Sequence, residues 1–206
     1  KRTMKRCLFL LAVAALAVNA PAQSTDDAHT LLDKIQQAVQ PPKPPAEWAG
    51  RVPSPEELAK FRAKQAEAAG LAADLATEFL TRFPAHAKAA EVLGQQYETL
   101  ANAVHKGATN RLAQLEKVEG TLLADPKMSS EDKFRLRMRG VDRRAGLKQT
   151  EGPDAMIAEF EKGARALQKE FPDRKEVFEM LYAVAMRSDG AKAAAIAKEI
   201  AASEAS

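Results

Sequence analysis

The sequence has a single cysteine in 206 residues, Cys7, and its three histidines lie far apart at positions 29, 86 and 105. One cysteine cannot form an intramolecular disulfide, and zinc sites need several convergent Cys or His ligands. His29, His86 and His105 have no such spacing. Cys7 also precedes the apolar run of the N-terminus and is expected to be removed with the signal peptide described below, so we expect no thiol chemistry, no bound metal and no cofactor in residues 23–206.

Catalytic motifs are also missing. The sequence contains no G-x-S-x-G nucleophile elbow, no glycine-rich phosphate-binding loop and no H-E-x-x-H motif. Its carboxylates, such as Glu56 and Glu57, occupy positions expected to be solvated or to cap a helix. We expect no active site within residues 23–206, although a longer parent protein could still be an enzyme.

Aromatic residues make up only 5% of the chain, and no segment shows the sustained alternation of apolar and polar residues that strands require. Alanine is abundant instead. The sequence therefore predicts an all-α fold whose core depends on close approach of helices rather than on large side chains.

The N-terminus has the pattern of a secretory signal peptide. Basic residues precede an apolar run over residues 8–18, and Ala20-Pro21-Ala22 follows as a cleavage pattern, with Met4 as the expected start. The run has 11 positions, whereas a membrane-spanning helix needs about 20. We expect residues 1–22 to be removed and the protein to be exported, with a periplasmic location and no stable membrane span after cleavage.

Cleavage changes the electrostatic argument. Residues 1–22 contain four cations and no acidic residue, so their removal takes the formal net charge from +3 to −1. The basic total would otherwise suggest nucleic acid as a partner. The mature chain gives no reason to expect one.

Residues 23–53 are predicted to form an N-terminal helix and a proline-rich linker. Apolar residues over 26–40 recur at helical spacing, and the prolines between 41 and 45 predict a semi-rigid polyproline spacer. Trp48 follows the spacer. It could pin the linker to the first helical hairpin, or it could contact a partner, and we favour the first role.

Residues 54–206 are predicted to form a helical hairpin domain. Ser54-Pro55-Glu56-Glu57 is a capping box with proline at the first helical position. Beyond it, apolar spacing predicts a series of helices over about 55–83, 85–105, 108–124, 130–148, 153–171, 173–188 and 191–202. The buried face of the first of these should comprise Leu58, Phe61, Leu71, Leu75, Phe79 and Leu80, and a later helix should bury Tyr182.

Proline marks three of the predicted turns: Phe83-Pro84, Pro126 and Phe171-Pro172. Pro84, Pro126 and Pro172 are 42 and 46 residues apart, which is typical of stacked helical pairs. The segment from Leu93 to Tyr97 resembles the Leu-Gly-x-x-Tyr part of a tetratricopeptide repeat, although other positions of that pattern do not match. We expect stacked antiparallel helical hairpins, either as a divergent tetratricopeptide-like array or as an irregular bundle.

The helix predicted over 130–148 is rich in arginine and is the second candidate for a partner contact, through Arg135, Arg139 and Arg143. Such a helix could hold an acidic partner, anionic lipid or nucleic acid. The alternative, which we favour, is a solvated face whose charges pair with acidic residues of neighbouring helices. Phe134 is the one aromatic residue among these arginines, which leaves little for base stacking.

Taken together, the signal peptide, the proline-rich linker and the Phe-Pro turns resemble the N-terminal helical region of exported thiol-disulfide oxidoreductases of the TlpA/ResA type. The resemblance rests on Phe83-Pro84, Lys88-Ala89-Ala90, Phe171-Pro172 and the helix around Ile196. It implies a docking or spacing module before a thioredoxin-like domain that would lie beyond Ser206. The alternative is a stand-alone exported tetratricopeptide-like scaffold that binds a protein or peptide, and the oligomeric state stays open.

Overall fold

The structure is a computed structural model that describes residues 25–204, so the predicted signal peptide lies outside the described residues. Within that range the fold is all-α, as the sequence predicts, and contains no strand. The helices are α1 (Thr25–Val39), α2 (Pro55–Arg82), α3 (Ala89–His105), α4 (Leu112–Leu123), α5 (Ser130–Leu147), α6 (Pro153–Glu170), α7 (Lys175–Ala185) and α8 (Gly190–Glu204), with short 3-10 turns η1 (Ala46–Trp48), η2 (Thr109–Arg111) and η3 (Gln149–Glu151).

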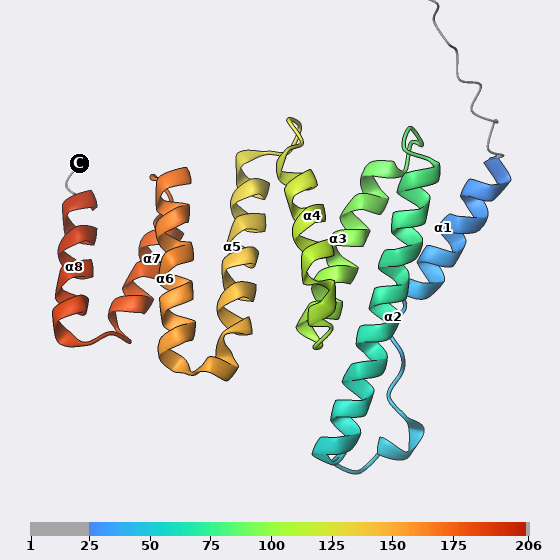
Figure 1. Cartoon of the computed structure of the whole chain (residues 1–206), viewed down its shortest axis with the longest axis horizontal. Coiled ribbons are helices and arrows are strands. Elements are labelled where there is room, and N and C mark those ends of the chain that lie inside the picture. The colour runs from blue at the N-terminus through green and yellow to red at the C-terminus, as the bar shows by residue number, and fades with distance from the viewer. Residues whose placement is uncertain (1–24, 205–206) are drawn as a thin grey trace, which may run out of the picture.

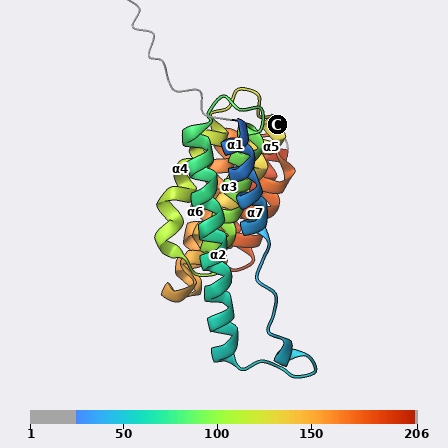
Figure 2. The ribbon, with the colours of Figure 1, turned by 90° about the vertical axis from the view of Figure 1, so that its right-hand side faces the viewer.

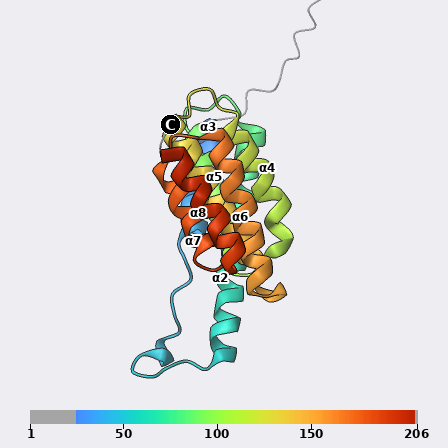
Figure 3. The same ribbon diagram turned by 90° about the vertical axis from the view of Figure 1, so that its left-hand side faces the viewer.

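The helices are stacked side by side in chain order, and neighbours run in opposite directions (Figure 1). Seen from either end of the stack, they form two layers (Figures 2 and 3). One layer holds α2, α4 and α6, and the other holds α3, α5 and α7. The second layer therefore presents one elongated face to which alternate helices contribute.

Two kinds of turn alternate along the stack. The α2–α3, α4–α5 and α6–α7 turns lie at the upper end of Figure 1, and they contain Pro84, Pro126 and Pro172. At the opposite end, Gly107 and Gly152 join the next pairs of helices with φ angles of +109° and +111°. Proline stops a helix by restricting the residue before it, whereas glycine alone adopts positive φ without strain.

The prediction that a new helix starts directly after Pro84 is wrong by four residues, because α3 begins at Ala89. Residues 84–88 form a turn in which the His86 backbone N–H donates to the Phe83 carbonyl at 3.1 Å. The Lys88 N–H donates to His86 Nδ1, also at 3.1 Å. The chain needs this turn to reverse direction, so His86 belongs to the turn and not to the helix.

The buried face of α2 consists mainly of alanine, which corrects the predicted set of large residues. Leu71 is 56% exposed, while Ala69, Ala73 and Ala76 are buried. At about 100° per residue, Leu71 lies about 200° round the helix from Ala69, on the opposite side. Of the six predicted residues only Phe79 is fully buried; Leu58, Phe61, Leu75 and Leu80 are half-buried.

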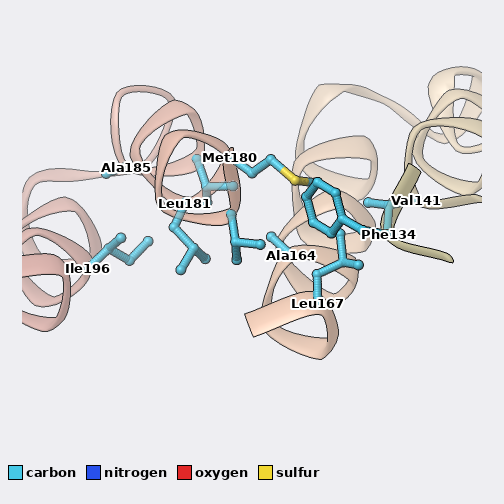
Figure 4. Packing of buried hydrophobic residues seen from close by; sticks show 10 residues of the cluster. Phe134, Val141, Ala164, Leu167, Met180, Leu181, Ala185 and Ile196 are labelled. Carbon is cyan, nitrogen blue, oxygen red and sulfur yellow. The ribbon is translucent and has the colours of Figure 1, made fainter. Parts of the chain in front are cut away.

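Larger side chains fill the core of the C-terminal half. Phe134 of α5, Leu167 of α6, Leu181 of α7 and Ile196 of α8 meet in one buried cluster (Figure 4). The Phe171 ring contacts the Phe134 ring edge to face, with 5.3 Å between their centroids. The two remaining clusters lie between α1, α2 and α3 and between α2, α3, α4 and α5, so the core continues along the stack.

The proline-rich linker is fixed to the first turns of α2. The half-buried Trp48 ring contacts the Phe61 ring at a centroid distance of 5.2 Å, which agrees with the pinning role. The capping box is formed: Ser54 Oγ accepts from the Glu57 N–H at 3.2 Å, and Glu57 Oε2 accepts from the Ser54 N–H at 2.8 Å. Arg51 donates to both carboxylate oxygens of Glu57, at 2.6 and 2.9 Å.

Over residues 25–204, none of the helices combines the length and the apolar character that crossing a membrane demands.

Candidate binding surface on helices α3, α5 and α7

The four residues that the sequence suggests as partner contacts do not form one site. Trp48 packs on α2, and Arg135 is exposed and pairs with Glu131 of its own helix at 2.9 Å. Arg139 and Arg143, in contrast, line a single hollow between α3 and α5. The structure therefore brings two of the four together.

We call this first hollow, of about 650 Å³, the polar hollow. Arg139 spans it and pairs with Glu98 of α3 at 2.6 Å. This hydrogen bond raises the pKa of Arg139, so the guanidinium stays charged. The hollow is lined by Tyr97, Glu98, Ala101, Val104, His105, Arg139, Asp142, Arg143, Gly146, Leu147 and Gln149.

Beneath the polar hollow lies a buried ion pair that joins α5 to α4. The side chains of Arg143 and Glu119 are only 11% and 8% exposed and hydrogen-bond to each other. Gly140 provides the space for this pair, because a Cβ at residue 140 would lie 2.9 Å from Glu119 Oε1. A glycine in the middle of α5 is thus explained by the carboxylate packed against it.

Tyr97 closes the floor of the polar hollow. Its hydroxyl is buried and has no hydrogen-bond partner within the described part of the chain. Burial raises the pKa of Tyr97 above its usual value, and the positive charge of Arg143 opposes part of that rise. The phenol is therefore neutral at physiological pH, and both arginines above it already have a carboxylate partner.

A second hollow, of about 420 Å³, opens between α5, α6 and α7, and we call it the apolar hollow. It is lined by Asp142, Ala145, Gly146, Met156, Ile157, Phe160, Ala183, Val184 and Arg187. Asp142 and Gly146 line both hollows, so the two adjoin at this part of α5. Gly146 has no side chain, and an added Cβ there would meet nothing within 4 Å. Residue 146 therefore places no side chain between the two hollows.

Two charges at the apolar hollow differ from the other charges of this region. Asp142 of α5 is exposed and has no ion pair or hydrogen bond to any residue between 25 and 204, while desolvation by its neighbours raises the pKa of its carboxyl group. Arg187 lies two residues beyond the end of α7, is also exposed and donates to the Ala183 carbonyl at 3.0 Å, and no described carboxylate pairs with it.

The arginines of α5 provide the contrast. All five of them pair with a glutamate: Arg135 with Glu131, Arg137 with Glu170, Arg139 with Glu98, Arg143 with Glu119 and Arg144 with Glu159. This pairing agrees with the favoured expectation of a solvated basic helix balanced by acidic neighbours. The unpaired Asp142 and Arg187 were not singled out by the sequence.

Two exposed apolar residues, Tyr182 of α7 and Met186 at its C-terminal end, are next in sequence to residues that line the apolar hollow, although they do not line it themselves. Tyr182 is 60% exposed and Met186 68%, so the prediction of a buried Tyr182 is wrong. They lie one turn apart and next to Ala183 and Arg187, which line the hollow. Their helical spacing is visible in the sequence, but which face of α7 is covered depends on how α6 and α8 pack against it.

The described residues contain no group of three or more His, Cys, Asp or Glu side chains placed to hold a metal ion. The chemistry that this surface offers is instead that of recognition: an apolar hollow, two uncompensated charges and exposed apolar side chains. Such a combination is typical of a site that binds another molecule.

No protein-family model, no curated protein and no solved structure matches this chain.

Proposed function

We propose that the helical stack is a non-catalytic interaction module, and that it binds a segment of a partner protein along the surface of α3, α5 and α7. The observation that carries the proposal is the apolar hollow with its unpaired Asp142 and Arg187. Both charged groups are exposed and lack an ion-pair partner, and the apolar side chains beside them are only half-buried, so all of them are open to contact with another molecule. A bound partner would cover them.

The arrangement of helices suits this role. A stack of helical pairs offers an elongated face whose length grows with each pair, and such faces accommodate extended or helical segments. The two adjoining hollows lie on that face. A partner segment that passes over Gly146 would contact both of them.

The sequence resemblance suggests a setting for the module. Before a thioredoxin-like domain of an exported thiol-disulfide oxidoreductase, it would dock or space the redox domain; as a stand-alone exported scaffold, it would bind its partner alone. Sequencing the coding region past Ser206 separates the two: a Cys-x-x-Cys motif supports the first, and a stop codon there excludes it.

Site-specific photo-crosslinking tests the binding role. The photoreactive amino acid p-benzoylphenylalanine would replace Tyr182, which precedes the hollow-lining Ala183, or, as a matched control, Leu71 on the exposed side of α2. The two positions are similarly exposed, at 60% and 56%. After irradiation in the producing cells, we expect one discrete adduct from position 182 and none from position 71. The proposal fails if position 182 gives no adduct, or if both positions give the same adducts.

A further inference from the structure

We infer that the apolar hollow recognises a segment in which a large apolar side chain stands between a basic and an acidic side chain. The apolar side chain enters the hollow, the basic group pairs with Asp142 and the acidic group pairs with Arg187. This inference rests on the proposed function and adds the chemical class of the partner.

The walls of the hollow select the central side chain. Met156, Ile157 and Phe160 of α6 face Val184 of α7 across it, and three of these four side chains are only half-buried. The volume of about 420 Å³ falls in the usual range of ligand-binding cavities, about 300–1,000 Å³. A leucine, methionine or phenylalanine side chain therefore fits within the hollow with room to spare, and it would remove part of this apolar surface from water.

The rim selects the flanking charges. Asp142 lies on α5 and Arg187 just beyond the C-terminus of α7, on either side of the hollow, and no ion pair joins them. Both are exposed, so a ligand cation can reach the Asp142 carboxylate directly. Arg187 needs the opposite partner. A segment of one sign only would satisfy one of the two and repel the other.

The charged residues of the polar hollow are poorer candidates for recognising a charged ligand than Asp142 and Arg187. Arg139 and Arg143 are paired with Glu98 and Glu119, so a bound anion would have to compete with a carboxylate already in place. The Tyr97 hydroxyl is covered by its surroundings and cannot be reached without movement. We therefore assign recognition of the partner segment's charges to the apolar hollow.

NMR titration of the ¹⁵N-labelled protein tests the inference, since it detects weak binding and locates it. The probes are capped peptides in which lysine, phenylalanine and glutamate are separated by zero, one or two glycines. We expect at least one spacing to shift the amide signals of Gly146 and Ala183. Peptides with alanine for phenylalanine, or with two lysines or two glutamates, should bind more weakly.

The protein variants Asp142→Asn and Arg187→Gln should each weaken binding of the best peptide by about two- to five-fold, as for partly exposed ion pairs. The most discriminating test is a charge reversal. The Asp142→Lys variant should bind the peptide with two glutamates better than the peptide with one lysine and one glutamate. Glu116→Lys provides the matched control, because Glu116 is an exposed carboxylate on α4 that lines neither hollow, and it should leave the preference unchanged.

The inference is overturned if no peptide shifts signals at the hollow at millimolar concentration, or if uncharged phenylalanine peptides bind equally well. It is also overturned if Asp142→Lys leaves the preference unchanged, or if sedimentation shows that a second copy of the chain occupies the surface. Photo-crosslinking from position 182 separates this failure from that of the proposed function. An adduct there, without peptide binding, leaves the interaction module intact and rejects only this recognition chemistry.

Discussion

Helices α2 and α3 bury their contact surface differently from α5, α6 and α7. The contact face of α2 is made of small residues such as Ala69, Ala73 and Ala76, which are nearly inaccessible. In the C-terminal half, Met156, Ile157 and Phe160 of α6 stay half-buried around an open hollow. Both regions are antiparallel helical packings, but small buried residues form the contact in one, whereas large half-buried residues surround a hollow in the other.

The difference shows what side-chain size does to a helical stack. Alanine lets two helices approach closely, and the alanines of α2 are buried in clusters shared with α1, α3, α4 and α5. Close approach also occurs once in the C-terminal half, where a Cβ at Gly163 would lie 2.6 Å from Val141 Cγ2. Away from that point larger side chains hold the helices apart, and the remaining apolar surface is left for a partner.

The strongest expected contrast is between two phenylalanines. Phe79 is fully buried, so Phe79→Ala should reduce the free energy of unfolding by about 3–5 kcal/mol. Phe160 is half-buried at the hollow, and Phe160→Ala should cost about 1 kcal/mol, roughly half the value of full burial. Urea unfolding measures both. Equal losses would mean that the hollow is part of the core and would remove the contrast.

The stability of the packing between α4 and α5 should depend on the buried ion pair between Glu119 and Arg143. Arg143→Met leaves Glu119 buried without a partner, and we expect a loss of about 3–5 kcal/mol in the free energy of unfolding. The double variant Glu119→Leu/Arg143→Met should recover most of that loss. Arg139→Met, which breaks an exposed pair, is the control and should cost at most about 1 kcal/mol. A double variant as unstable as Arg143→Met would contradict the account.

Adding volume should have opposite signs in the two regions. Ala73→Leu forces three carbons into the buried α2–α3 contact and should destabilise the protein by about 1–3 kcal/mol. Gly146→Ala adds one carbon where nothing lies within 4 Å, and alanine is the better helix former, so it should stabilise by about 0.5–1 kcal/mol. Thermal unfolding followed by circular dichroism tests both. A stabilising Ala73→Leu would show that α2 and α3 are not closely packed.

The smallest effect is expected at the exposed start of α2, away from its buried contact with α3. Hydrogen bonds, first from Arg51, lower the pKa of Glu57 from 4.5 to about 2. A lowered pKa in the folded state stabilises the fold above pH 4.5, and this contribution is lost as the pH falls towards 2. An NMR titration of Glu57 should show the low pKa, and Arg51→Gln should raise it. An unshifted Glu57 would mean that the linker is not held on α2.

The sequence predicts well those structural features that depend on residues close together in the chain. The capping box at Ser54, the prolines at three turns and the order of the helices all depend on neighbouring residues, and the structure has them. The exposed Leu71 and Tyr182 were missed because both faces of α2 and α7 carry apolar residues, and stacking decides which face is covered. The start of α3 was missed because Pro84 permits a helix but the reversal of the chain requires a turn.

The candidate site was predicted least. Arg139 and Arg143 were among the expected partner contacts, but their carboxylate partners lie 41 and 24 residues away in the sequence. Asp142 and Arg187 became notable only because neighbouring helices leave them unpaired. Whether a charge is compensated depends on long-range packing, which a single sequence does not show directly.

Filling the apolar hollow tests most directly whether it is a binding surface or a packing defect. Ala183 lines the hollow, so Ala183→Leu would occupy part of it while keeping a good helix former in α7. The measurement combines the melting temperature with photo-crosslinking from position 182. We predict an unchanged or higher melting temperature together with loss of the adduct. Retention of the adduct in a folded Ala183→Leu protein would contradict the assignment of the hollow as the binding surface.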